Sequence, residues 1–152
     1  MTAIHGEMTP TTPLMPGERV EHSFASDRAT YWRDHAWMAA LAMAVGMGLL
    51  AAAGNPHVWT GAVGGLTAIA VRAFYLASDE LSARWDLTDR RLLGPGGRAI
   101  ALSQIMRVRS LGSAVQVITK TGDKHLIKYQ ADRAGVTALL DDTMGRSGAR
   151  ET

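Results

Sequence analysis

The side chains best suited to do chemistry in this sequence are the arginines and lysines of its second half. Residues 84–128 hold nine Lys or Arg against three Asp, whereas residues 1–35 hold three Arg against five acidic residues. The sequence pI of about 9.3 therefore describes the second half of the chain. Such a balance indicates binding of an anionic partner or an anionic surface.

Basic residues near the apolar segments and on the predicted strands are the candidate contacts with anionic lipid or an acidic partner. In the predicted strand 104–110, Arg107 and Arg109 alternate with Met106 and Val108, which predicts one basic and one apolar face. Three interpretations of the basic face stay open: a solvated exterior, a lipid contact and a protein contact. The full candidate set is Arg72, Arg90, Arg91, Arg107, Arg109 and Lys128.

Arg72 differs from the other candidates because it lies inside an apolar segment, 58–77. Either its long side chain reaches back to the membrane interface, or it pairs with an acidic residue or a lipid headgroup.

Patterns typical of catalysis or metal binding are weak. The run Gly94-Pro95-Gly96-Gly97 lacks the Gly-Lys-Ser/Thr of a phosphate loop and precedes a predicted strand, so it indicates a hairpin turn. The histidines, at 5, 22, 35, 57 and 125, have no metal-ligand spacing, and the chain has no cysteine. We therefore expect no catalytic residue, no metal and no cofactor, and neither enzymatic activity nor nucleic-acid binding.

The basic residues are carried by a chain that contains one long uncharged run. Residues 36–71 contain no Asp, Glu, Lys or Arg. The run predicts two transmembrane helices, 36–54 and 58–77, each close to the roughly 20 residues that cross a bilayer core. Between them, Gly54-Asn55-Pro56-His57 combines a helix-ending glycine, an N-capping asparagine and a proline suited to a first helical turn. With about 70 further residues, the chain is too short to bury two helices that are apolar all round.

Basic residues predict the orientation of this hairpin, 36–79. Arg28 and Arg33 precede it and Arg84 follows it, whereas its turn has no basic residue. Both termini are therefore expected in the cytoplasm, in a multi-pass protein. The polar N-terminal segment, 1–35, lacks the apolar core of a secretory signal.

Small residues predict how the two helices pack. In the first helix Ala36, Ala40, Ala44, Gly48 and Ala52 recur every four residues, and Gly61 and Gly65 form a GxxxG in the second. Such rows allow close backbone approach in a membrane. The two rows either face each other within one chain or contact another subunit. The candidate helix-packing face is Ala40, Ala44, Gly48, Gly61 and Gly65.

Residues 80–142 predict a small antiparallel β domain with a C-terminal helix. Turn residues bound short strands at 83–86, 90–93, 98–102, 104–110, 114–119 and 125–130. Asp132 is a suitable N-cap for a helix over 131–142, and 143–152 is predicted to be a flexible tail.

Three motifs, in order, resemble a known family. The run Trp85-Asp86-Leu87-Thr88-Asp89-Arg90-Arg91-Leu92-Leu93 resembles the y-x-l-T-x-x-R-l opening of the bacterial pleckstrin-homology-like (PH-like) domains that follow paired transmembrane helices. Ile100-Ala101-Leu102-Ser103-Gln104-Ile105 is similar to their i-x-l-x-x-I strand. Pro16-Gly17-Glu18-Arg19-Val20 is similar to the p-g-E-x-v that precedes their first helix.

The resemblance implies a half-barrel of strands with a C-terminal helix, a bacterial inner-membrane location and a binding or assembly role without catalysis. Relatives include assembly factors for photosynthetic complexes and components of envelope-stress systems. The roughly 60 residues after the hairpin are few for a seven-stranded barrel.

We therefore expect a membrane-anchored scaffold that assembles with or stabilises other integral membrane proteins, or pairs with a second copy of itself. The alternatives are an accessory subunit of a large respiratory or photosynthetic complex and a sensor of anionic lipid surfaces.

Overall fold

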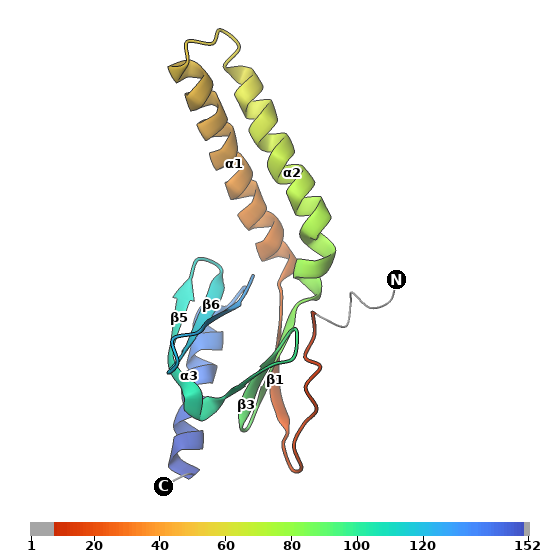
Figure 1. Ribbon diagram of the computed structural model, residues 1–152, viewed down its shortest axis with the longest axis vertical. Coiled ribbons are helices and arrows are strands. Elements are labelled where there is room, and N and C mark those ends of the chain that lie inside the picture. The colour runs from red at the N-terminus through yellow and green to blue at the C-terminus, as the bar shows by residue number, and fades with distance from the viewer. Residues whose placement is uncertain (1–7, 151–152) are drawn as a thin grey trace. The chain divides into compact units, whose positions relative to one another are not determined.

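The computed structural model describes residues 8–150, which divide into two units. The β unit comprises residues 8–28 and 79–150, and the helical unit comprises residues 29–78. The chain forms β1 (Val20–Ala25), then helices α1 (Arg28–Ala52) and α2 (Trp59–Ser82), then β2 (Arg84–Thr88) (Figure 1). The helical hairpin is thus an insertion between the first two strands of the β unit.

The β unit contains two antiparallel sheets. The first has the order β1-β2-β3-β4, with β3 at Arg91–Gly94 and β4 at Arg98–Ala101. The second has the order β5-β6-β7, formed by Ile105–Leu111, Ala114–Thr119 and Lys124–Ile127. A 3-10 turn, Leu102–Gln104, joins the sheets, and helix α3 (Arg133–Arg150) follows β7.

Strand β1 corrects the expectation that residues 1–35 form only a polar segment outside the β domain. It pairs with β2 in the register Phe24↔Trp85 and Ala25↔Arg84. Of its six residues Phe24 alone is buried, so β1 lacks the clear alternation that marks a strand. With β1, seven strands are present in the described residues.

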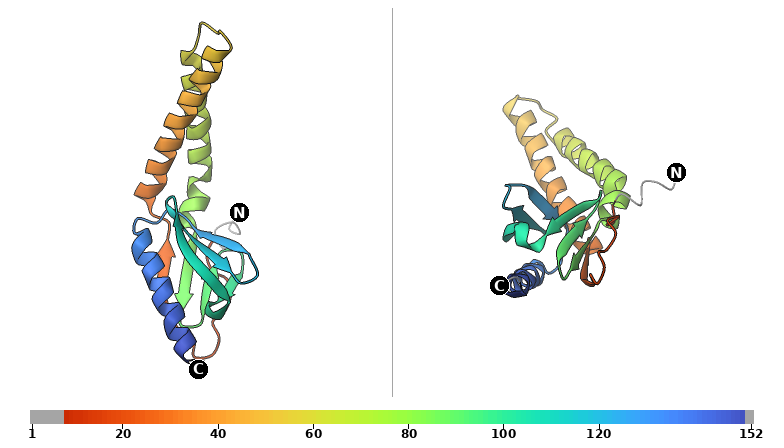
Figure 2. Two further views of the ribbon diagram at one scale, coloured as in Figure 1. Left: turned by 90° about the vertical axis from the view of Figure 1, so that its left-hand side faces the viewer. Right: turned by 60° about the horizontal axis from the view of Figure 1, so that its bottom comes forward.

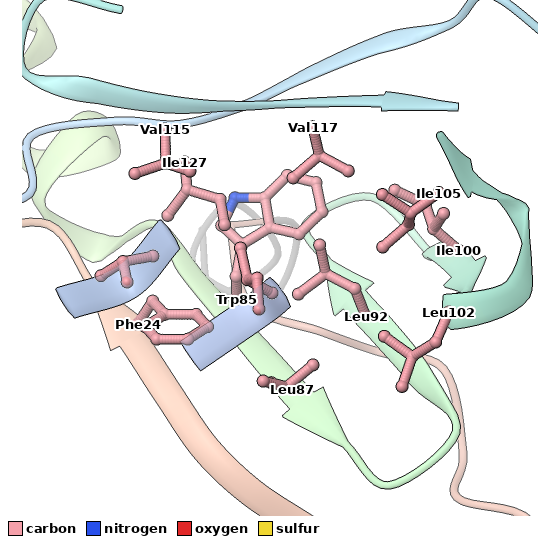
Figure 3. Close-up of a cluster of buried hydrophobic side chains, with 12 residues drawn as sticks. Phe24, Trp85, Leu87, Leu92, Ile100, Leu102, Ile105, Val115, Val117 and Ile127 are labelled. Atoms are coloured by element: carbon pink, nitrogen blue, oxygen red, sulfur yellow. The ribbon is translucent and has the colours of Figure 1, made fainter. Parts of the chain in front are cut away.

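Apolar side chains from both sheets and from α3 form one core in the β unit (Figure 3). Trp85 is 5% exposed and packs on Gly94, where a Cβ atom would overlap its ring. Val136 and Leu140 bring α3 into the same core, and Figure 2 shows that helix running beside the strands. The buried members are Phe24, Trp85, Leu87, Leu92, Ile100, Leu102, Ile105, Val115, Val117, Ile127, Val136 and Leu140.

Helix α3 begins as expected and ends later than expected. Asp132 Oδ1 accepts a hydrogen bond of 2.9 Å from the Gly135 N–H, which is the predicted N-cap. The helix continues to Arg150, so residues 143–150, which were predicted to lie beyond it, are helical. The continuation is stabilised because Thr143 is buried and Arg146 forms an ion pair with Glu21 of β1 at 3.3 Å.

In the helical unit, α1 and α2 are each long and apolar enough to cross a membrane. The predicted stop signal is confirmed, since Gly54 has a positive φ of 69°. The predicted start signal is not, because α2 begins at Trp59 and the His57 N–H donates to Asn55 Oδ1 at 2.8 Å in a local turn before the helix. Helix α1 begins at Arg28, eight residues before the predicted 36. Tyr31 explains the extension because its hydroxyl donates to the Ala73 carbonyl of α2 at 2.6 Å.

Candidate interaction surface

The outward face of the β5-β6-β7 sheet gathers basic side chains. Cross-strand pairing joins Arg107 to Ile118, and Ile118 to Lys124. Directly paired residues share one face of a sheet. The three cations Arg107, Arg109 and Lys124 are all exposed. We call Arg107, Arg109, Lys124 and their exposed neighbour Leu126 the basic sheet face.

A β-bulge changes the other side chains of β5. The register shifts between Ile105 and Arg107, so Met106 is the extra residue and is 60% exposed. Met106 therefore does not share the apolar face with Val108, as simple alternation predicted. Arg109 keeps its predicted direction, and its Nε donates to Gln116 Oε1 at 2.7 Å.

Arg91 is held in an ion pair with Glu18 and only 16% of its side chain is exposed, so it offers little surface to a partner, which corrects its place among the candidates. Its Nη2 lies 2.6 Å from Glu18 Oε2, and its Nε donates to Glu18 Oε1 at 2.9 Å. Thr88 Oγ1 donates to the same Oε1 at 2.7 Å. The Arg91 hydrogen bonds lower the pKa of Glu18 from 4.5 to about 2, against the opposing effect of burial. The same hydrogen bonds raise the pKa of Arg91.

Arg90 and Lys128 are exposed cations with acidic neighbours. Arg90 Nε lies 3.9 Å from Asp89 Oδ2, and Lys128 Nζ lies 3.1 Å from Glu80 Oε1. Both pairs are open to solvent, where screening makes them weak. Neither cation belongs to the basic sheet face as defined above, so the six candidates do not form one cluster.

Arg72 contacts a histidine of the neighbouring helix. Its Nη1 lies 3.4 Å from His35 Nε2, and His35 Nδ1 lies 2.9 Å from the Tyr31 carbonyl oxygen. A carbonyl only accepts, so Nδ1 carries the proton and Nε2 accepts from Arg72. The ion pairs found among residues 8–150 do not include Arg72.

Two predicted residues of the helix-packing face, Gly61 and Gly65, lie at the contact between α1 and α2. A Cβ atom at Gly61 would overlap the backbone of Gly46, and one at Gly65 would lie 2.5 Å from the Ala42 carbonyl carbon. Glycine is therefore required at both positions for this approach.

Of the two arrangements predicted for the α1 row, the one in which it faces α2 is wrong, because Ala40, Ala44 and Gly48 are exposed and a Cβ atom at Gly48 would meet nothing within 4 Å. The residues that face α2 include Ala42 and Gly46 instead. At 3.6 residues per turn, each step of four residues rotates by about 40° around the helix. Residues with that spacing therefore drift around the helix and cannot all face the same neighbouring helix over many turns.

Sequence reasoning missed Glu18 and Gly46 as important residues. Glu18 stands in the motif Pro16-Gly17-Glu18-Arg19-Val20, and Thr88 and Arg91 stand in the second motif. The two motifs thus meet in space. One motif contains an acidic residue and the other contains a threonine and an arginine, and this combination could have predicted their contact. Gly46 was hidden among neighbouring small residues.

No group of three or more His, Asp or Glu side chains in residues 8–150 could hold a metal ion. Comparison with protein-family models, curated proteins and solved structures gives no match for this chain. The function is therefore argued from the residues themselves.

Proposed function

We propose that this chain is a bacterial inner-membrane protein whose helices α1 and α2 cross the membrane and which binds and holds other integral membrane proteins. The observation that carries the proposal is the exposure of large apolar side chains around the whole hairpin. Trp37, Leu49 and Phe74 are 72%, 68% and 76% exposed. Leaving such groups in water costs about 25 cal/mol per Å² of apolar surface, which a lipid environment removes.

Strand pairing supports a single cytoplasmic location for both halves of the β unit. The chain leaves the first sheet after Ala25 and re-enters it at Arg84, and these two residues are paired. A hairpin joined to paired residues has both ends on one side of a membrane. Arg28, Arg33 and Arg84 flank those ends, which favours the cytoplasmic side.

The strand order supports a PH-like domain. Four strands, then three strands, then a helix is the arrangement expected of a half-barrel closed by a C-terminal helix. The contact of Glu18 with Thr88 and Arg91 gives a physical reason for the motif residues that carry the resemblance.

The outward row of α1 favours a scaffold or an accessory subunit over an isolated anchor. Ala40, Ala44 and Gly48 are not used by α2 and leave a shallow apolar surface. In a membrane, such a surface suits a closely packed helix of another protein or of a second copy.

Purification from the native membrane in mild detergent tests this proposal. The variant with Ala44→Leu and Gly48→Leu should lose the co-purifying proteins that the unchanged chain retains. Gly64→Leu in α2 is the matched control, because a Cβ atom at Gly64 would also meet nothing within 4 Å. Retention of every partner by the α1 variant would contradict the proposed helix contact.

A second candidate function, sensing of anionic lipid, is favoured by the basic sheet face. Exposed Leu111 and Leu126 lie beside Arg107 and Arg109, which combines apolar and cationic groups on one surface. A basic residue near an anionic membrane contributes about 1 kcal/mol.

The lipid function is tested with the full chain in nanodiscs, using an environment-sensitive dye on a single cysteine at position 111. Phosphatidylglycerol should shift the dye emission to the blue relative to phosphatidylcholine, and salt or the changes Arg107→Glu and Arg109→Glu should abolish the shift. Equal emission in both lipids would exclude this function. An isolated 80–152 fragment is unsuitable because it lacks β1.

A further inference from the structure

The β unit contains a cleft of about 950 Å³ beside β7. It is lined by β7, by the β3–β4 turn at 95–98 and by Met8 and Thr11. The core side chains Phe24 and Trp85 also reach it. A volume of this size is typical of clefts that bind ligands. The cleft therefore combines polar and charged groups with a small apolar area next to the edge of a sheet.

The edge of β7 carries backbone groups that β6 does not use. The Thr119 N–H donates to the Asp123 carbonyl at 2.9 Å, which makes these residues a hydrogen-bonded pair. In an antiparallel ladder bonded pairs alternate, so the next bonded residue of β7 is His125. The N–H and C=O groups of Lys124 and Leu126 therefore point away from β6. Within residues 8–150, β7 is the last strand of its sheet.

The chain itself closes one end of this edge. The Lys128 carbonyl accepts a hydrogen bond of 3.0 Å from Gln130 Nε2, and Ser26 Oγ lies 3.5 Å from the same oxygen. The open edge is thus limited to Lys124 and Leu126. Lys124 and Leu126 each present a backbone N–H and C=O group there, which allows a short extended segment to pair with β7 as an added strand.

Two cations of the cleft, Arg98 and Lys124, form no ion pair with another described residue. The acidic residue in the lining, Glu80, is paired with Lys128. Arg98 Nη1 donates to the Pro95 carbonyl at 3.1 Å and keeps further donors available. The cleft is therefore complementary to negative charge.

The same charges disfavour a second copy of this chain as the occupant. If β7 strands of two copies paired antiparallel around Leu126, Lys124 of one copy would lie opposite Lys128 of the other. Like charges opposite each other destabilise a sheet, and edge lysines commonly block such self-pairing. A partner with carboxylates avoids this repulsion.

We propose that the cleft binds an extended, acidic segment of a partner protein, which adds to β7 as an antiparallel or parallel strand. The inference rests on the proposed scaffold function and specifies the chemistry of its partner. Backbone groups of Lys124 and Leu126 bind the segment, and Arg98 and Lys124 attract its carboxylates. An apolar side chain of the segment packs toward Trp85.

The test uses the full chain in phosphatidylcholine nanodiscs with four labelled hexapeptides, in which Glu alternates with Val, Ile, Leu or Phe. At least one peptide should bind, as measured by fluorescence anisotropy, and should slow hydrogen exchange at Lys124 and Leu126. Leu126→Pro removes an N–H that points to the open edge and leaves the β6–β7 ladder intact. It should weaken binding about tenfold, whereas Leu126→Ala, the matched control, should bind normally.

A second variant, Lys124→Gln, keeps the backbone and should also weaken binding, and peptides with Lys in place of Glu should not bind. Failure of all four acidic peptides to bind, or equal binding to the Leu126→Pro and Leu126→Ala variants, would overturn the proposal. Slowed exchange caused by phosphatidylglycerol nanodiscs without peptide would assign the edge to lipid instead. Because this test uses synthetic peptides and not the native partner, its outcome does not depend on the co-purification experiment. Failure of the proposed cleft binding can therefore be told apart from failure of the proposed scaffold function.

Discussion

Replacing Glu18 by Gln preserves the shape of the side chain and removes its charge. In the folded protein the Glu18 side chain is 0% exposed and binds Arg91 through two hydrogen bonds. Thr88 donates a third. The change leaves Arg91 as a mostly buried cation without its anion, which is among the costliest defects in a protein interior. We therefore expect the β unit to lose stability.

The pKa of Glu18 gives the size of this loss. At about 1.4 kcal/mol per pKa unit, lowering the value from 4.5 to about 2 corresponds to about 3–4 kcal/mol of stabilisation. The folded pKa is below the unfolded one, so this contribution is complete above pH 4.5 and is lost as the pH falls toward 2. About half should remain at pH 3. In a unit of this size, 3–4 kcal/mol lowers Tm by roughly 12–32 °C.

Thermal unfolding of the detergent-solubilised full chain measures the effect, with Trp85 as the reporter in a background of Trp32→Phe, Trp37→Phe and Trp59→Phe. Glu21→Gln is the matched control, because Glu21 forms a solvent-exposed pair with Arg146 at 3.3 Å and should contribute less than about 1 kcal/mol. The reasoning fails if Glu18→Gln costs no more than the control, or if its cost is the same at pH 7 and pH 3.

Two further predictions concern close contacts at glycine. Changing Gly61 and Gly65 to Leu should weaken helix association by about 1–2 kcal/mol and make the hairpin protease-sensitive, whereas Gly64→Leu should not, because Gly64 faces open space. Gly94→Ala should cost about 1–3 kcal/mol in the same melting assay, because the added methyl group overlaps the Trp85 ring; an unchanged Tm would contradict this packing.

Local signals explain which elements could be predicted from the sequence. The turn between α1 and α2 follows from Gly54 and Asn55, and the β3–β4 turn follows from 94–97, because these residue types have specific backbone preferences. Strand β1 could not be recognised in this way. Its partner β2 lies beyond the whole hairpin in sequence, and a single buried residue, Phe24, gives no period.

The candidate residues show the same limit. Alternation correctly gave Arg107 and Arg109 a common outward direction, although it could not predict the bulge at Met106. Arg91 looked like one more surface cation because its anion, Glu18, lies on a distant segment. Whether a charge is buried depends on its partner, and that partner is set by the fold.

The position of the turn relative to the membrane tests the central claim most directly, and this cysteine-free chain allows single cysteines at 22, 57 and 121. An impermeant maleimide applied to intact spheroplasts should label position 57, in the turn, and leave 22 and 121 unlabelled until the membrane is permeabilised. Positions 22 and 121 must agree, because both lie in the β unit, whose two sheets share one core. Labelling of 121 without 57 would reverse the orientation, and labelling of all three in intact spheroplasts would contradict a membrane-spanning hairpin.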